Sequence, residues 1–196
     1  MEDALSNLHQ CVYLLLFVEI ASYRSLLYDY RVPMSKSRPE IYLIAQNIRS
    51  LFNVGALFRC ADVFGVSRVY LCGYTGCPPR PEITKTALGA ETWITWERWA
   101  QTHLLLKQLR RQGMCVVVLE TGSRSKPLPA LKPTFPLALV VGNEVTGVSP
   151  AVRRLADEVV EIPMLGQKES LNVAVAAGIT LYQLRFGRSR HTFHKR

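Results

Sequence analysis

The sequence predicts an α/β fold in which helices flank a mostly parallel sheet. From residue 41 onward, short apolar runs rich in β-branched residues alternate with helical patterns, which is typical of βαβ units. Two of the runs, at residues 115–119 and 137–141, lack polar alternation and therefore read as strands buried on both faces. A chain of 196 residues that is 48% hydrophobic can form one well-packed domain, expected over residues 39–187.

Helix-start and helix-stop residues divide this domain into elements. Gly65 and Gly113 are expected to end helices, because glycine readily adopts the left-handed conformation found after a last helical turn. Ser149 and Pro150 are typical of a helix start. In chain order we expect strand 41–45, helix 54–64, strand 69–72, loop 73–81, short helix 83–90, helix 99–112, strand 115–119, loop 126–136, strand 137–141, helix 149–155, strand 159–162 and helix 170–186.

Trp93, Trp96 and Trp99 recur every third residue, in a stretch expected to run from a strand into a helix. Their rings could stack on nucleic-acid bases. Packing in a core or a subunit interface is favoured, because aromatic residues are the ordinary material of both.

Both ends of the chain are expected to lie outside the main domain. Residues 1–38 form an N-terminal extension that is either helical or, if Met34 is the biological start, not native. The apolar run at residues 11–18 is about half the length of a membrane span, so we expect no membrane association through it. Residues 188–196 form a basic tail, which either contacts phosphates or is simply solvated.

Charge and cysteine content indicate the kind of partner and compartment. The 24 Lys and Arg residues against 15 Asp and Glu give a net charge of +9, which favours nucleic acid or an anionic membrane surface as partner. The five cysteines include no C-x-x-C pair and lie mostly in apolar runs, as buried cytoplasmic thiols do. Cys72 and Cys77 have no histidine near them in sequence, so we expect no metal.

Three polar clusters, at residues 47–59, 142–149 and 163–172, each follow a predicted strand. In open α/β sheets, ligands bind beyond the carboxyl ends of the strands, so we expect the clusters to converge on one site. The chain contains neither a G-x-G-x-x-G fingerprint nor a P-loop, which argues against an ordinary dinucleotide site.

Arg59 is the most unusual residue of the first cluster. It stands among apolar residues in the sequence, a setting in which a guanidinium needs an anionic partner such as a phosphate or carboxylate. The alternative is a structural ion pair with Asp62 or Glu144. Asn53 and Gly55 lie where a loop is expected to give way to a helix.

The other two clusters combine glycines or polar side chains with strand ends and helix starts. Gly142 and Gly147 flank Glu144, where glycine permits close approach by a ligand or by another backbone segment. Ser170 fits a helix cap, whereas capping would leave Asn172 without a reason at its position, which favours a functional role for Asn172.

Together the clusters resemble the motifs of the SpoU (TrmH-like) family in the SPOUT superfamily of RNA methyltransferases. The resemblance spans roughly residues 41–186. The three matching motifs are Asn53-x-Gly55-x-x-x-Arg59, Gly142-Asn-Glu144-x-x-Gly147, and Ile162-Pro-Met164 with Ser170-Leu-Asn172.

This resemblance implies a C-terminal trefoil knot, the SPOUT α/β knot, and a homodimer. It implies S-adenosylmethionine (AdoMet) as cofactor, bent within the knot and held largely by backbone groups at Thr121, Gly142, Ile162 and Leu171. The implied reaction is methylation of a ribose 2′-hydroxyl in RNA. A tRNA substrate is preferred over rRNA, because an appended RNA-binding module is not evident.

The implied catalytic set is Arg59 with Asn53, Glu144, Ser170 and Asn172, which would align the guanidinium and the ribose with the methyl carbon. Family descriptions give the arginine a base role, but a guanidinium with a pKa above about 12 is not readily deprotonated. Stabilising the alkoxide electrostatically is easier, and a phosphate could accept the proton.

Three other interpretations stay open. A knotted RNA-binding or assembly factor without catalysis is disfavoured by the intact Asn53, Arg59, Glu144 and Asn172. A base-methylating relative is disfavoured by the ribose-type first motif. A flavodoxin-like small-ligand domain would explain the alternation of elements but not the three clusters or the charge.

Overall fold

The computed structural model describes residues 38–123, 125–168 and 170–187. Residues 39–187 belong to one compact unit. The predicted N-terminal extension and basic tail lie outside the described residues, so these domain assignments stay predictions. Within the described ranges, no helix combines the length and the apolar character needed to cross a membrane.

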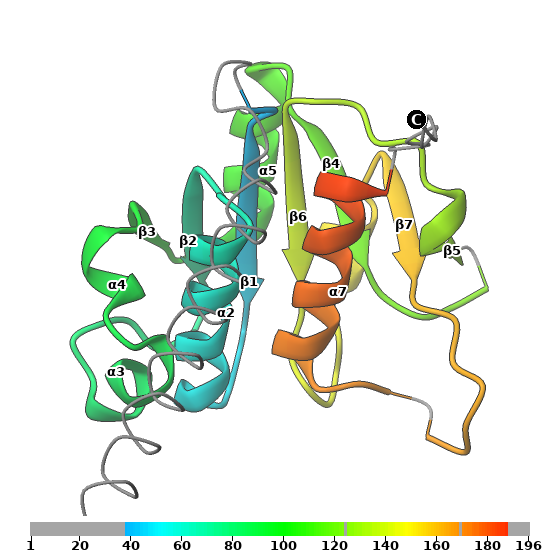
Figure 1. Ribbon diagram of the computed structural model, residues 1–196. Coiled ribbons are helices and arrows are strands. Elements are labelled where there is room, and N and C mark those ends of the chain that lie inside the picture. The colour runs from blue at the N-terminus through cyan, green and yellow to red at the C-terminus, as the bar shows by residue number, and fades with distance from the viewer. Residues whose placement is uncertain (1–37, 124, 169, 188–196) are drawn as a thin grey trace, which may run out of the picture. The chain divides into compact units, whose positions relative to one another are not determined.

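A seven-stranded sheet with the order β3-β2-β1-β6-β4-β7-β5 forms the centre of this unit (Figure 1). All its strand pairs are parallel, so the predicted α/β class is confirmed. The central pair joins β1 to β6 in register from Ile41↔Leu137 to Ala45↔Val141. The strands are β1 (Ile41–Gln46), β2 (Arg68–Cys72), β3 (Trp96–Trp99), β4 (Cys115–Leu119), β5 (Lys126–Pro127), β6 (Leu137–Val141) and β7 (Glu158–Glu161).

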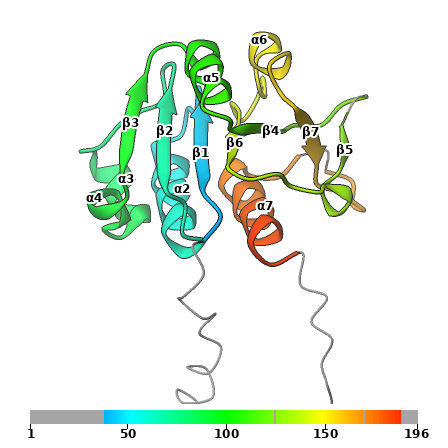
Figure 2. The same ribbon diagram turned by 90° about the horizontal axis from the view of Figure 1, so that it is seen from above.

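Helices cover both faces of the sheet (Figure 2). Leu43 packs in the core on one face with Leu57, while its neighbour Ile44 packs on the other face with Leu105. Side chains alternate along a strand, so a strand covered on both faces is apolar throughout. One face carries α2 (Leu51–Val63), α3 (Pro81–Ala87), α4 (Ala90–Trp93), η1 (Leu128–Ala130) and α7 (Val173–Phe186), and the other carries α5 (Thr102–Arg111) and α6 (Pro150–Arg153).

Helix α2 begins three residues earlier than predicted. Ser50 caps it by accepting the Asn53 N–H at 3.3 Å, so Asn53 and Gly55 lie inside the helix and not in a loop before it. Gly55 also packs closely on α3, because a Cβ at this position would come within 2.2 Å of the Ile83 carbonyl oxygen.

Two further differences have local causes. The short helix predicted at residues 83–90 is divided into α3 and α4, because Leu88 and Gly89 take positive φ values of 52° and 94°. Strand β5 and η1 lie within the predicted loop 126–136, where a Lys-Pro strand of two residues leaves no periodicity to detect.

Two of the three tryptophans are partly buried and pack against the core, as favoured. Trp96 meets Phe58 edge-to-face with ring centroids 6.5 Å apart. Trp99 packs against the core cluster beneath α5. Trp93 is 59% exposed, and its indole N–H donates to Asp62 at 2.9 Å. The stretch is more than one element, as predicted, but the predicted order from strand into helix is wrong. It runs from α4, which ends at Trp93, into β3, and the next helix begins only at Thr102.

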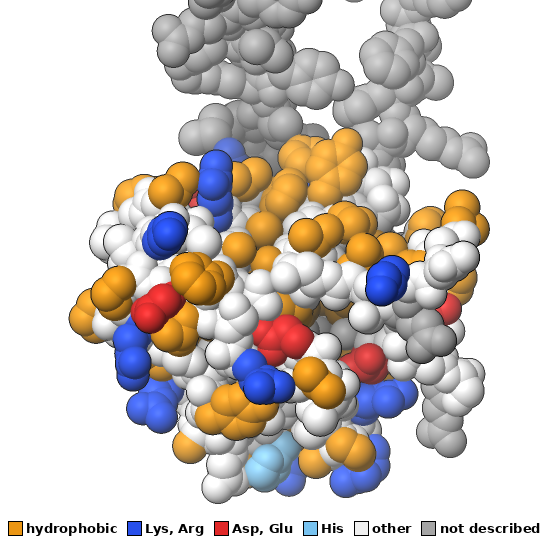
Figure 3. Space-filling view, turned by 90° about the horizontal axis from the view of Figure 1, so that it is seen from below, with side chains coloured by type: hydrophobic (Ala, Val, Ile, Leu, Met, Phe, Trp, Pro, Cys, Tyr) orange, Lys and Arg blue, Asp and Glu red, His pale blue; other side chains and the backbone are white. Residues whose placement is uncertain are grey.

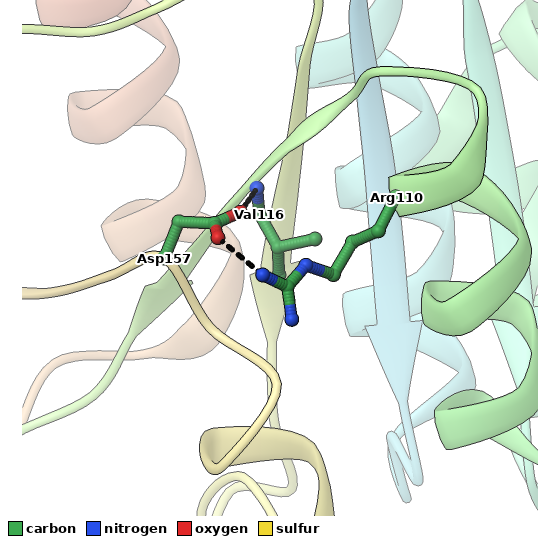
Figure 4. A network of polar contacts seen from close by, with 3 residues as sticks. All are labelled: Arg110, Val116 and Asp157. Atoms are coloured by element: carbon green, nitrogen blue, oxygen red, sulfur yellow. Dashed lines mark hydrogen bonds and ion pairs between the residues drawn. The ribbon is translucent and has the colours of Figure 1, made fainter.

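Asp157 joins α5, β4 and β7 (Figure 4). Its backbone N–H donates to the Val116 carbonyl at 2.9 Å, and its carboxylate accepts the Val116 N–H and an Arg110 N–H, each at 2.8 Å. The side chain therefore acts as one more pairing partner for β4, immediately before β7 pairs with this strand through its backbone.

Helix α7 returns the chain to the first part of the domain. It packs beside α2 and against η1, which lies in the connection from β4 to β6. Its Arg185 donates to the carbonyl oxygens of Phe64 and Gly65 at 2.7 and 2.6 Å, beyond the end of α2. The trefoil knot implied by the family resemblance stays a prediction.

Candidate functional site

The three polar clusters converge, as predicted, at the edge of the sheet where β1, β6 and β7 end. Hydrogen bonds join residues 91 and 119 positions apart in sequence across this edge. Figure 3 shows the edge, with acidic side chains near its centre and Lys and Arg side chains around them. The parallel direction of the strands produces the convergence, because it places all their carboxyl ends together.

A chain of amides and a carboxylate links the first, second and third clusters. Asn53 Nδ2 donates to Glu144 Oε1 at 2.8 Å, and Asn172 Nδ2 donates to Asn53 Oδ1 at 2.9 Å. Asn172 Oδ1 in turn accepts the N–H groups of Ala174 and Val175. Every amide orientation in this chain is therefore determined by its neighbours.

Glu144 also holds the start of α2. Its two carboxylate oxygens accept the backbone N–H groups of Arg49 and Ser50 at 3.0 and 3.1 Å. Burial alone would raise the pKa of Glu144, but the hydrogen bonds from Arg49, Asn53 and Ser50 outweigh it and leave the pKa below its ordinary value. Glu144 is therefore ionised at neutral pH, with its oxygens occupied by donors.

Asn172 has a structural role that its sequence position did not reveal. It is the N-cap of α7, which begins at Val173 and not near Ser170. The prediction that capping would leave Asn172 unexplained is therefore wrong. Its side-chain oxygen, Oδ1, caps the helix, and its side-chain NH₂ group donates to Asn53.

Arg59 lies apart from this network. Its side chain is exposed on α2, so the apolar setting inferred from its sequence neighbours is wrong. Among the described residues, Arg59 forms an ion pair with neither Asp62 nor Glu144, and it donates to neither Asn53 nor Asn172. Within the described part of one chain, hydrogen bonds thus join Asn53, Glu144 and Asn172 but include neither Arg59 nor Ser170.

A pocket of about 340 Å³ lies next to Glu144, beyond the ends of β4, β6 and β7. Its size is within the range of small-molecule and cofactor sites. The four residues expected to contact the cofactor all line it, together with Ser170 and the carboxylates of Glu120, Glu144 and Glu161. The four are Thr121, Gly142, Ile162 and Leu171.

The loop after β6 forms one wall of this pocket and is tightly folded. A Cβ on Gly142 would come within 2.4 Å of the Val148 nitrogen, so the glycine admits another backbone segment of the same loop. Gly147 has a φ of 65°, and a Cβ there would lie 2.1 Å from Glu120 Oε2.

Two residues that shape this loop were missed by sequence reasoning. Glu120 accepts the Val148 N–H at 2.6 Å from the end of β4. Asn143, which is 6% exposed, accepts the N–H groups of Val145 and Thr146 at 2.9 and 2.8 Å. The only sequence signal was the place of Asn143 between Gly142 and Glu144, since its more distant partners are not visible in the sequence.

Burial raises the thiol pKa of each described cysteine. Burial raises the pKa of the Cys72 thiol to about 12, which keeps it protonated. No group of His, Cys, Asp and Glu side chains in the described ranges is placed to hold a metal ion.

Residues 40–182 match the SpoU rRNA Methylase family. The chain is 30% identical over 167 residues to the tRNA (guanosine(18)-2'-O)-methyltransferase of Aquifex aeolicus, a match that covers 85% of this chain and 78% of the relative. It is 31% identical over 150 residues to the 23S rRNA (guanosine-2'-O-)-methyltransferase RlmB of Vibrio vulnificus, covering 76% of this chain and 60% of that relative.

Solved structures give the same result. The A. aeolicus TrmH/SpoU tRNA modifying enzyme superposes with a TM-score of 0.70 at 31% identity, over 76% of each chain. The AdoMet-bound rRNA methyltransferase from Sinorhizobium meliloti superposes with a TM-score of 0.73 at 28% identity, over 78% of this chain and 58% of that one. Most of this chain matches the family, and the family's motifs lie together at one edge of the sheet. The chain therefore belongs to the SpoU rRNA methylase family.

Proposed function

We propose that this protein is an AdoMet-dependent RNA methyltransferase that modifies a ribose 2′-hydroxyl. The position of Glu144 carries the proposal. Glu144 lines the cofactor-sized pocket, and it also lines an open depression together with Arg49, Ser50 and Asn53. A methyl donor in the pocket and a nucleotide in the depression would therefore meet at this residue.

The pocket suits AdoMet in chemistry as well as size. Leu119, Val141 and Ile162 line the pocket and offer apolar contacts for an adenine ring. Glu120 and Glu161 line the same pocket and provide negative charge for a cationic ligand. AdoMet would supply the methyl group of a sulfonium, and the neutral thioether that remains after transfer is an excellent leaving group.

In the proposed mechanism, Glu144 positions other groups and does not take the proton. Its lowered pKa and its occupied oxygens make it a poor base at neutral pH, whereas they hold Asn53 and the start of α2 in place. Asn53 and Asn172 fix the ribose edge of the depression, and Ser170 lines the pocket beside them.

Arg59 supplies the positive charge in this proposal. Its guanidinium is exposed and therefore accessible to an RNA phosphate, and it would stabilise the developing alkoxide electrostatically if the bound RNA brought the ribose to it. The guanidinium is already protonated and cannot take the hydroxyl proton, so in this proposal the proton leaves to a phosphate oxygen or to solvent while Arg59 stabilises the alkoxide. Arg59 would have to reach the reacting ribose from outside the Glu144–Asn53–Asn172 network.

RNA is the proposed partner, and tRNA is preferred over rRNA. The net charge of +9 supports a polyanionic substrate. The tRNA relative from A. aeolicus is matched over 78% of its length, against 60% for the rRNA relative from V. vulnificus, which supports the preference. A cytoplasmic location is proposed with it, because RNA modification and unpaired thiols suit a reducing compartment.

A homodimer is the proposed assembly. Helix α7 carries exposed apolar side chains at positions spaced by four, three and four residues, which form one stripe on an α-helix. The family resemblance implies a homodimer, and a second copy of the chain is the occupant that we propose for this stripe. Its members are Val175, Ile179, Tyr182 and Phe186, exposed by 51%, 41%, 57% and 43%.

The test is transfer of tritiated methyl from AdoMet to unfractionated tRNA and, separately, to rRNA, followed by digestion to nucleosides. Label in a 2′-O-methylnucleoside is expected, with tRNA as the better substrate. Arg59→Lys should lose most activity while it keeps AdoMet affinity, because a point charge cannot reproduce the guanidinium fork. Cofactor binding without transfer to either RNA would favour the alternative, a non-catalytic RNA-binding or assembly factor.

A further inference from the structure

Tyr74 is an exposed aromatic residue held in place beside the candidate site. It follows β2, and its side chain is 60% exposed. Single exposed aromatic residues are common on protein surfaces and do not by themselves indicate a function. Tyr74 differs because the hydrogen bonds of its neighbours restrain both ends of the residue.

The hydroxyl of Tyr74 accepts a hydrogen bond from Asn143 Nδ2 at 2.8 Å, and its backbone N–H donates to Asn47 Oδ1 at 3.3 Å. Asn143 also donates to the Asn47 carbonyl at 2.9 Å, so the three residues form a closed clasp between the ends of β1, β2 and β6. The ring therefore has its polar atom bound and much of its surface in solvent.

Close packing supports the clasp. Gly73 has a φ of 65°, and a Cβ there would lie 1.9 Å from Asn47 Oδ1, so only glycine fits before Tyr74. Asn47 itself has a φ of 58°, a conformation that asparagine tolerates better than most residues. Asn47 and Gly73, two residues with left-handed backbone conformations, therefore both contribute to the position of this ring.

The clasp places Tyr74 on a particular side of Glu144. Asn143 directly precedes Glu144, which lines the cofactor-sized pocket beyond β4, β6 and β7. Tyr74 lies on the other side of this loop, beyond β2, towards the end of the sheet that β3 forms. A ligand that contacts Tyr74 would approach Glu144 from the side opposite the cofactor pocket.

We propose that Tyr74 is a stacking platform for a base of the RNA substrate, next to the nucleotide whose ribose reaches Glu144. This inference rests on the proposed function. An aromatic ring accepts the face of any base, and single-stranded RNA is commonly bound by such stacking. Because the ring is restrained before RNA arrives, little side-chain entropy is lost on stacking.

Cationic groups at the same edge suit the phosphates of such an RNA. The backbone N–H of Arg49 is bound to Glu144, while the Arg49 residue is exposed and lines the depression beside it. Arg80 is exposed in the segment that follows Tyr74. A stacked base with a cationic side chain near its phosphate, as Arg49 would provide, is a combination that binds single strands with little dependence on sequence.

The test compares Tyr74→Leu with Tyr74→Phe, which keeps the ring but removes the hydroxyl. Tyr74→Leu should lower kcat/KM for unfractionated tRNA by about 5- to 100-fold, mainly through KM, the loss expected for one stacked base. Tyr74→Phe should stay within about threefold of wild type. AdoMet affinity should be unchanged in both. Trp93→Leu is the matched control, since Trp93 is equally exposed, has its N–H bound, and lies on α4.

A second readout separates stacking from general damage. In binding of unfractionated tRNA measured by fluorescence anisotropy, Tyr74→Leu should shift the affinity but leave its salt dependence unchanged, whereas Arg49→Gln should reduce that dependence. Equal losses in the Phe and Leu variants, or a fall in AdoMet affinity or melting temperature, would assign Tyr74 to structure alone and overturn the proposal.

Two further outcomes are distinguishable. If Tyr74→Leu changes the sedimentation of a wild-type dimer to that of a monomer, the ring is covered by a second copy of the chain and the proposal is wrong. If wild-type protein methylates neither tRNA nor rRNA, the proposed function fails. The anisotropy comparison would then still decide whether Tyr74 contacts RNA.

Discussion

Both carboxylate oxygens of Glu144 already accept hydrogen bonds, which makes this residue a poor proton acceptor. Three donors from residues 49–53 converge on one carboxylate, and each of them stabilises the ionised form. The same bonds fix the start of α2 relative to the loop after β6. A residue of a catalytic motif can therefore serve as the part that keeps two loops in register.

This arrangement makes stability depend on pH. Because the pKa of Glu144 is depressed in the folded protein, its contribution is complete above the ordinary glutamate pKa of about 4.3 and is lost as pH falls through the folded value. We expect wild type to be more stable than Glu144→Gln at pH 7 and the difference to shrink below about pH 4.

Urea unfolding of both proteins between pH 3 and 7 measures this difference. Glu97→Gln is a suitable control, since the Glu97 carboxylate is exposed and its contact with Arg68 is 3.4 Å long. A wild-type advantage that persists unchanged at low pH would show that the Glu144 carboxylate does not need its charge.

Helix α7 connects stability with the site through its first residue. Asn172 caps the helix with its carbonyl oxygen and holds Asn53 with its NH₂ group, so two substitutions separate the roles. Asn172→Ala should lower stability by about 1 kcal/mol, the usual cost of an N-cap, and should also reduce methyl transfer.

Asn172→Asp should behave differently. A carboxylate still caps a helix, and the helix dipole favours it, but one of its oxygens would face Asn53 Oδ1. Stability should therefore lie between that of the Ala variant and that of wild type. The donor to Asn53 is lost, so kcat should fall as it does in the Ala variant. Thermal melting and single-turnover kinetics on both variants provide the measurement, and full activity in the Asp variant would remove the Asn172–Asn53 bond from the mechanism.

The elements that could be predicted from the sequence are those whose burial is complete. The strands β4 and β6 are uninterrupted apolar runs because both faces are covered. The start of α7 could not be predicted, since Ser170 and Asn172 are equally good caps on paper and only hydrogen-bond geometry separates them. Glu120 and Asn143 were missed because Val148 and Tyr74, their partners, lie 28 and 69 positions away.

The exposed stripe on α7 has its consequence at the scale of the assembly. Ile179→Lys should place a charge in the middle of this stripe and convert a dimer into a monomer, with loss of methyl transfer if the dimer is the active form. Leu104→Lys is the matched control, because Leu104 is 46% exposed on α5, across the sheet from α7. Sedimentation velocity at several protein concentrations measures the outcome, and a wild-type monomer would remove the stripe as a subunit interface.

The bond between Asn53 and Asn172 spans 119 positions of sequence. During synthesis α2 leaves the ribosome long before α7. The first motif is therefore present before the third motif, which contains Asn172, has been made. A nascent chain that ends before residue 170 has the first two motifs but lacks Ser170 and Leu171, which line the pocket, and the amide of Asn172 that holds Asn53. Methylation competence therefore arises at the end of translation, and incomplete copies of the enzyme should be inert towards the RNA around them.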